Sequence, residues 1–98
     1  MLFLISLEYL RPLTEVDAHL VGHRAFLARH FEAGHFLLSG PKVPRTGGLI
    51  LAQADSREAL EAWLDEDPFR HYGLARFDVT GWEPTMKNAA FERALHQP

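Results

Sequence analysis

TEVDAHLVGHRAFLARHFEAG, residues 14–34, is the stretch that decides the fold, because both of its ends carry helix signals. Thr14 can accept a hydrogen bond from the first backbone amides of a helix, and Asp17, three residues on, completes a capping-box pattern. Gly34 supplies the left-handed residue that commonly ends a helix. The sequence therefore predicts one long helix from Thr14 to Gly34.

The apolar side chains of this segment predict which face of the helix packs inward. At the helical period of about 3.6 residues they form one stripe, with Phe26 and Ala33 along its border. His23 falls inside the stripe, whose members are Val16, Leu20, Leu27 and Phe31. An imidazole that an amphipathic helix carries toward the core asks for a chemical explanation.

Length and composition limit the class of protein. The 98 residues form one domain, small enough that a partner subunit would help to bury its apolar faces. The net charge of -3, from 10 basic and 13 acidic residues, leaves no basic stripe, so we expect no nucleic-acid partner. The absence of cysteine excludes disulfides, thiolate nucleophiles and zinc–thiolate sites. The apolar run Leu2–Leu7 is too short for a membrane span or for a signal peptide's apolar region, so we expect a cytoplasmic protein with no membrane association.

The rest of the chain carries alternating strand and helix signals. Asp55-Ser56 offers caps for a second helix, Arg57 to about Glu66. Pro68 interrupts that helix, and Asp67 is placed to cap a short turn that ends at Tyr72. The segment after Gly34 ends in a sharp turn at Gly40-Pro41, followed by a polar loop, Lys42–Gly48. The four predicted strands are Leu2–Tyr9, His35–Ser39, Leu49–Ala54 and Leu74–Trp82.

This order predicts an α+β fold with a ferredoxin-like βαββαβ antiparallel sheet over residues 1–85. Right-handed crossovers place both helices on one face of the sheet. Because the first strand has apolar residues on both faces, the face of the sheet without helices needs a cover. A second copy of the same chain is the simplest cover. We therefore expect a homodimer or a higher homo-oligomer. Residues 86–98 form a tail with weak helical spacing.

Several short motifs at matching spacings resemble the YciI-like, or YCII-related, proteins. They are His23 in the first helix, Ala33-Gly34 at its end, Ser39-Gly40-Pro41, Asp67-Pro68-Phe69 and Gly73-Leu74. The resemblance covers Leu2 to about Pro84. One difference is that some relatives carry an arginine-proline pair shortly before the histidine, where this chain has Val21-Gly22.

The resemblance implies a dimeric α+β barrel of ferredoxin-like halves, related in architecture to muconolactone isomerases. In the family a histidine and an aspartate are proposed to share a pocket, and the matching positions here are His23 and Asp67. Most members have no established activity, and at least one is similar to a dehydrochlorinase that acts on a chlorinated hydroxyquinol. The differing arginine position means that an anionic substrate bound there by relatives cannot be assumed for this chain.

A histidine-aspartate pair can act in proton transfer. A carboxylate that binds one imidazole nitrogen fixes the tautomer, so the other nitrogen can take or give a proton. This favours elimination or isomerisation, and the chain lacks the residues of a nucleophile elbow. The alternative is that His23 is a core histidine and that Asp67 only caps the short turn.

Other residues are candidates for binding a small-molecule ligand. Ser39, Gly40 and Pro41 either line a pocket or form a plain turn that ends the strand. Arg45 in the polar loop can reach an anionic ligand, although loop arginines are usually solvated. Phe69 is either an aromatic wall or core packing.

Three histidines lie near one line of the first helix, at the spacing that can hold a metal ion. No carboxylate or cysteine nearby completes a ligand set, so a metal site stays a minor alternative for His19, His23 and His30. We expect neither a metal nor a cofactor.

The sequence therefore leaves three hypotheses. The first is a cofactor-independent lyase or isomerase that acts on a small cyclic or aromatic acid, with His23 as general acid or base and Asp67 as its orienter. The second is a module that binds a metabolite without converting it. The third is a domain that serves only dimerisation or protein contact.

Overall fold

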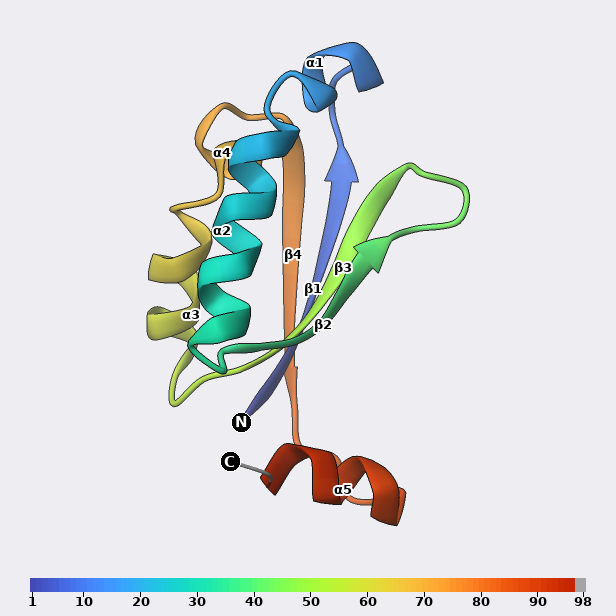
Figure 1. The fold of residues 1–98 in the computed structure, drawn as a ribbon, viewed down its shortest axis with the longest axis vertical. Helices are drawn as coiled ribbons and strands as arrows, with labels where there is room; N and C mark the ends of the chain where they lie inside the picture. Colours follow the sequence, from blue (N-terminus) through green and yellow to red (C-terminus); the bar gives the residue numbers. More distant parts are fainter. Residues whose placement is uncertain (97–98) are drawn as a thin grey trace.

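Helices α2 and α3 lie on one face of a four-stranded antiparallel sheet (Figure 1). The computed structural model describes residues 1–96. The strands are ordered β2-β3-β1-β4, which confirms the predicted ferredoxin-like fold. The elements follow one another as β1 (Leu2–Tyr9), α1 (Leu13–Asp17), α2 (Leu20–Glu32), β2 (Phe36–Pro41), β3 (Gly47–Gln53), α3 (Arg57–Leu64), α4 (Pro68–His71), β4 (Ala75–Trp82) and α5 (Ala89–His96).

The prediction of one unbroken helix from Thr14 was wrong, because the chain leaves helical geometry between α1 and α2. His19, the residue before α2, has φ -112° and ψ 11°, and its side chain does not cap the helix. Thr14 lies inside α1, which starts after Pro12. The Asp17 carboxylate binds the Arg45 guanidinium at 2.6 Å instead of completing a capping box.

The predicted stop at Gly34 is confirmed. Gly34 has φ +80°, a conformation that L side chains rarely adopt. Its amide donates to the Phe31 carbonyl at 3.0 Å, and the His35 amide donates to the His30 carbonyl at 2.9 Å. These two bonds form a Schellman motif, which turns the chain from α2 directly into β2.

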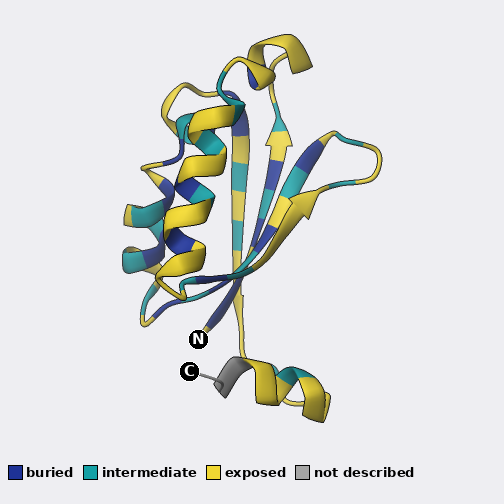
Figure 2. Cartoon of the chain, viewed as in Figure 1, coloured by how far each residue is buried: buried dark blue, intermediate teal, exposed yellow. Residues whose placement is uncertain are grey.

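The break before α2 also changes which side chains face the core. Phe26 and His30 are the buried residues of α2, whereas Phe31 is 39% exposed. The buried face of α2 therefore differs from the predicted one, because Phe26 lies at its centre and not at its border. The reason is that α1 and α2 are not one continuous helix and do not share one helical phase. Figure 2 shows that α2 carries both exposed and buried positions. Its buried Phe26 packs in one core cluster with residues on the inner face of the sheet, among them Phe3, Ile5, Leu7, Ile50 and Ala52.

Strand β2 runs further than predicted, and Gly40-Pro41 is not a sharp turn. Pro41 pairs with Gly48 inside the ladder of β2 and β3. The proline is tolerated because β2 is an edge strand, where one missing amide donor leaves no partner unpaired. The hairpin therefore turns through residues 42–46.

The predicted caps of α3 and α4 are confirmed. Ser56 Oγ accepts a hydrogen bond from the Ala59 amide at 3.1 Å, at the start of α3. Asp67 Oδ1 accepts one from the Phe69 amide at 2.9 Å, at the start of α4. Gly73, with φ +65°, then leads into β4.

Helices α2 and α3 leave the opposite face of the sheet uncovered (Figure 1), and several apolar side chains on that face are exposed. Leu38, Leu51 and Leu4 lie in one row across β2, β3 and β1. Leu4 is 38% exposed and Leu38 60%.

A helix follows β4 in the tail, as its spacing suggested, while positions 97–98 of that tail lie outside the described residues. Nowhere in residues 1–96 is there a helix both long and apolar enough to cross a membrane.

Candidate active site

His23 on α2 and Asp67 at the start of α4 are in direct contact. The Nδ1 atom of His23 lies 2.9 Å from Oδ1 and 3.0 Å from Oδ2 of Asp67. The Asp67 side chain is fully buried, and that of His23 is 13% exposed. Gly22 permits this approach, because a Cβ at that position would lie only 3.2 Å from Pro68 Cγ.

The aromatic ring of Phe69 stacks on one face of the His23 imidazole. The two rings stack with centroids 4.0 Å apart and an angle of 5° between their planes. Tyr9 of β1 meets Phe69 edge-on at 6.0 Å. With its face stacked and Nδ1 bound to a carboxylate, the imidazole has a fixed orientation. Nε2 has no hydrogen-bond partner among the described residues.

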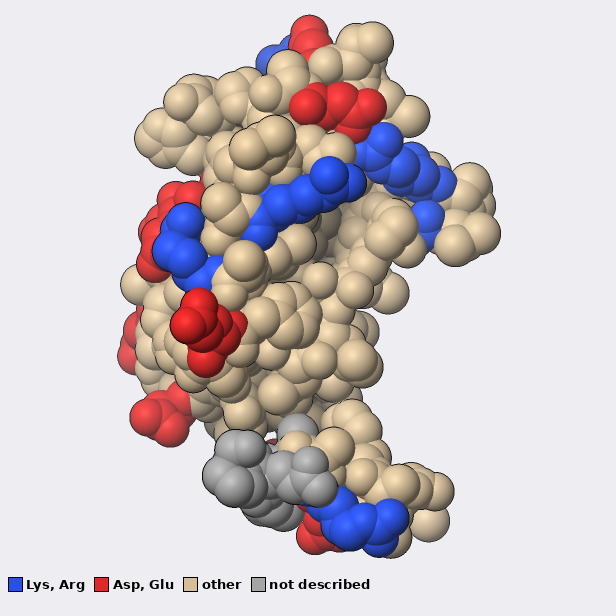
Figure 3. Space-filling model, viewed as in Figure 1, with Lys and Arg blue, Asp and Glu red and all other residues tan. Residues whose placement is uncertain are grey.

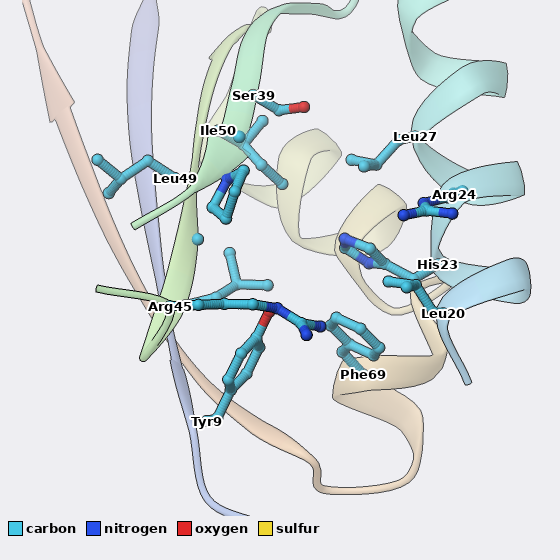
Figure 4. Close-up of a pocket in the computed structure, with 14 residues that line it drawn as sticks. Tyr9, Leu20, His23, Arg24, Leu27, Ser39, Arg45, Leu49, Ile50 and Phe69 are labelled. Carbon is cyan, nitrogen blue, oxygen red and sulfur yellow. The ribbon is translucent and has the colours of Figure 1, made fainter. Parts of the chain in front are cut away.

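A cavity of about 330 Å³ opens beside this imidazole, between α2 and the β2–β3 hairpin. Figure 4 shows the His23 ring and the Ile50 side chain pointing into it, while the Leu49 side chain points away. The walls are mostly apolar. They come from Leu7 and Tyr9 on β1, Leu20, His23, Arg24 and Leu27 on α2, Ser39, Gly40 and Pro41 on β2, Arg45, Gly48, Leu49 and Ile50 on the hairpin, and Phe69 on α4.

The residues expected to bind a ligand lie around this one cavity. Ser39, Gly40, Pro41, Arg45 and Phe69 all line it together with His23. Asp67 lies behind the imidazole and does not line the cavity. Gly40 contributes backbone only, and a Cβ added there would meet nothing within 4 Å. The functional role of these residues stays a prediction.

Two residues of the wall, Arg24 and Tyr9, were not among those expected to bind a ligand. Arg24 is exposed, and it also lines the cavity directly after His23. Tyr9 could have been found, because strand alternation places it on the same face as Phe3, Ile5 and Leu7.

Arginine side chains make the mouth of the cavity positively charged. Arg45 binds Asp17 of α1 at 2.6 Å, and its guanidinium lies 5.6 Å from the centre of the Tyr9 ring. The hydrogen bond from Arg45, with a smaller contribution from the charge of Arg24, lowers the pKa of Asp17. The same bond, followed by one to Tyr9, raises the pKa of Arg45. Figure 3 shows basic side chains gathered across this end of the molecule, over α2 and the hairpin loop.

The three helix histidines weighed as metal ligands contact different partners. His23 binds Asp67, and the His19 ring contacts the Tyr72 ring at a tilt of 32°, with centroids 4.5 Å apart. His30 binds His35 through the two Nδ1 atoms at 2.9 Å, and Glu66 through Nε2 at 3.0 Å. Within the described part of the chain, no group of three or more histidine, aspartate or glutamate side chains is arranged to hold a metal ion.

Comparisons with known proteins agree with this architecture. The solved structure of 5-chloro-2-hydroxyhydroquinone dehydrochlorinase TftG from Burkholderia phenoliruptrix AC1100, in complex with 2,5-dihydroxybenzoquinone, superposes with a TM-score of 0.73. It is 25% identical in sequence, and the match covers 85% of this chain and 94% of that one.

A curated relative is similar in sequence. The Xenovulene A biosynthesis cluster protein asL2 of Sarocladium schorii is 33% identical over 75 residues, which cover 64% of each protein. This chain therefore spans less than two thirds of that relative's length. The family model described as YCII-related domain matches residues 1–83, which include all the strands and the whole cavity wall. The chain thus belongs to the YCII-related domain family.

Proposed function

We propose that this protein is a small enzyme that transfers a proton on a hydroxylated aromatic or cyclic acid, as a lyase or an isomerase that needs no cofactor. His23 is the general base or acid, acting through Nε2. Asp67 contacts the imidazole and does not line the cavity, so it is the positioning residue of His23.

The observation that carries this proposal is the environment of the His23 ring. A fully buried carboxylate accepts a hydrogen bond from Nδ1–H, and this tautomer leaves the lone pair on Nε2. That nitrogen belongs to a residue that lines a cavity, so a bound substrate can reach it. A histidine that served only packing would not need a fixed tautomer beside an open, mostly apolar space.

The cavity and the structural relative support an aromatic or cyclic substrate. A volume of about 330 Å³ lies at the small end of ligand-binding sites, as a molecule with a single ring requires. The relative TftG is a dehydrochlorinase of a chlorinated hydroxyhydroquinone and was solved with a benzoquinone. The stacked Phe69 and the aliphatic walls offer apolar contacts to such a ring.

The proposed chemistry balances without a further reactant. In an elimination, Nε2 takes a proton from a substrate hydroxyl or ring carbon, and the electrons of that bond form a new double bond. The leaving group departs with its own bonding pair, for example as chloride. In an isomerisation, the same nitrogen returns the proton to another carbon.

The experiment that tests this proposal measures chloride release from 5-chloro-2-hydroxyhydroquinone and proton exchange in unsaturated cyclic acids. We expect turnover by the native protein and a loss of about 10²-fold or more in kcat for His23→Asn. His71→Asn is the matched control, because His71 is an exposed histidine on α4. A ligand that stabilises the protein yet is recovered unchanged after long incubation would favour a binding module instead.

We propose that the working form is a homodimer that covers the open face of the sheet. Leu4, Leu38 and Leu49 lie on that face, and each is more than a third exposed. Trp82, at the end of β4, is 39% exposed. Burial of such a contiguous apolar surface against its own copy is the usual way to form a symmetric pair.

A further inference from the structure

Arg24 brings an unpaired positive charge to the wall of the cavity. It follows His23 on α2, and Figure 4 shows its guanidinium beside the His23 imidazole. Among the described residues Arg24 forms no hydrogen bond and no ion pair. Arg29, on the same helix, differs because it binds Glu66 at 3.5 Å.

A second guanidinium lies on the opposite wall. Arg45 reaches the cavity from the hairpin loop, and its contact with Asp17 fixes its position. Arg45 forms a direct ion pair with that carboxylate, whereas Arg24 interacts with it only at longer range and forms no ion pair with it. The lining also includes His23, and it contains no aspartate or glutamate.

An anionic ligand fits this charge pattern better than a neutral one. The interior walls are aliphatic and aromatic, so a ring can lie between α2 and β3 against Leu27 and Ile50. Its ionised oxygen then reaches a guanidinium at the mouth, where a charge-assisted hydrogen bond is stronger than a neutral one. The aspartate nearest the imidazole, Asp67, is buried behind it and does not repel the anion directly.

We propose that Arg24 and Arg45 form an anion subsite, and that Arg24 is the residue that selects substrates with an acidic oxygen. The substrate class is a single ring whose hydroxyl or carboxyl group is ionised at neutral pH. This inference rests on the proposed function, since it names the substrate of the same cavity. Arg24 holds the anion, Arg45 is the second contact, and the ring presents its transferable proton to His23 Nε2.

Binding of 2,5-dihydroxybenzoquinone by calorimetry tests the subsite separately from turnover. Its hydroxyl groups are vinylogous acids and ionise at neutral pH, whereas its dimethyl ether has the same ring and no ionisable hydroxyl. We expect Arg24→Gln to weaken binding of the ionised quinone by about tenfold to a hundredfold and to leave binding of the ether unchanged. Arg24→Lys keeps the charge and should recover part of the affinity. Arg29→Gln is the matched control on the same helix.

The outcomes separate this inference from the proposed function. If Arg24→Gln loses affinity for the ionised quinone alone, and added salt weakens binding to the native protein, the subsite is supported even where no turnover is found. If Arg24→Gln binds the ionised quinone as tightly as the native protein does, or loses affinity for both compounds equally, the subsite is wrong. The same conclusion follows if the native protein prefers the ether or binds neither compound. Turnover that depends on His23 would then still support the proposed function.

Discussion

The Oδ1 atom of Asp67 is shared between two elements, because it lies 2.9 Å from His23 Nδ1 and 2.9 Å from the amide nitrogen of Phe69. One buried carboxylate thus both orients the imidazole and caps α4. A substitution of Asp67 is therefore expected to affect both the proposed chemistry and the fold, and the two effects have to be separated.

Asp67→Asn separates them. Asparagine keeps an oxygen for the Phe69 amide, but its NH₂ group faces Nδ1 and favours the tautomer that carries the proton on Nε2. We expect kcat for base-catalysed turnover to fall by about 10²-fold or more. The free energy of unfolding in urea should fall by only about 1–3 kcal/mol.

Two further variants complete this measurement. Asp67→Ser keeps a helix cap but is too short to hold the imidazole, so it should lose turnover as well. Asp65→Asn is the control, because Asp65 is 74% exposed and contacts only Arg70, at 3.7 Å. Full turnover in Asp67→Asn, with an unchanged pH profile, would mean that Asp67 serves only as a cap.

Gly47, where β3 begins, is a second position at which the fold and the cavity meet. A Cβ at Gly47 would overlap the carbonyl oxygen of Leu7, and backbone on both strands would have to move. We expect Gly47→Ala to lower the free energy of unfolding by about 2 kcal/mol or more, measured in urea. The shift should also displace the loop that carries Arg45. Gly40→Ala in the same hairpin is the control, because nothing lies within 4 Å of its added Cβ, and equal losses in the two variants would refute the steric explanation.

Much of the local structure could be predicted because it depends on contacts between near neighbours in the chain. The cap of Ser56 on Ala59, the cap of Asp67 on Phe69 and the stop at Gly34 each involve residues no more than a few positions apart. Such signals can be read directly from the sequence. The pairing of His23 with Asp67 spans 44 positions, and only the family resemblance suggested it.

The errors arose where a distant residue competes with a local signal. Asp17 looks like part of a capping box, but Arg45, 28 positions away, binds its carboxylate. Gly40-Pro41 looks like a turn, but an edge position in the sheet lets the strand continue through the proline. Arg24 is exposed, but no pattern on the helix reveals that the hairpin opposite makes it part of a cavity wall.

The open face of the sheet yields a prediction about assembly. We expect the native protein to have the mass of a dimer in light scattering, and Leu49→Arg to have the mass of a monomer, because the charge would be buried in the interface. Leu49 is 41% exposed, and its side chain points away from the cavity (Figure 4). Val43→Arg is the control, because Val43 is 97% exposed on the hairpin loop and outside the sheet. A native protein that stays monomeric at high concentration would contradict the proposed dimer.

The cluster of His30, His35 and Glu66 predicts how stability depends on pH. Burial and the nearby His30 lower the pKa of His35 from 6.5, although Glu66 opposes this shift. Just below pH 6.5, the unfolded chain therefore binds more protons at His35 than the folded chain does. The contribution of neutral His35 to the free energy of unfolding is thus complete above pH 6.5, and it is lost as the pH falls through the pKa of His35 in the folded protein. The hydrogen bond from His30, aided by Arg29, lowers the pKa of Glu66 from 4.5, and its contribution is lost only in more acidic solution.

Urea unfolding across this pH range should thus show two successive losses of stability. His35→Asn should remove the first loss and keep the second, because an asparagine does not titrate while Glu66 is unchanged. His71→Asn, which replaces an exposed histidine, should keep both. The geometry explains the order, since the two Nδ1 atoms of His30 and His35 lie 2.9 Å apart and can share only one proton. A second proton on the pair must break that contact between α2 and β2, so a first loss that persisted in His35→Asn would have to come from another group.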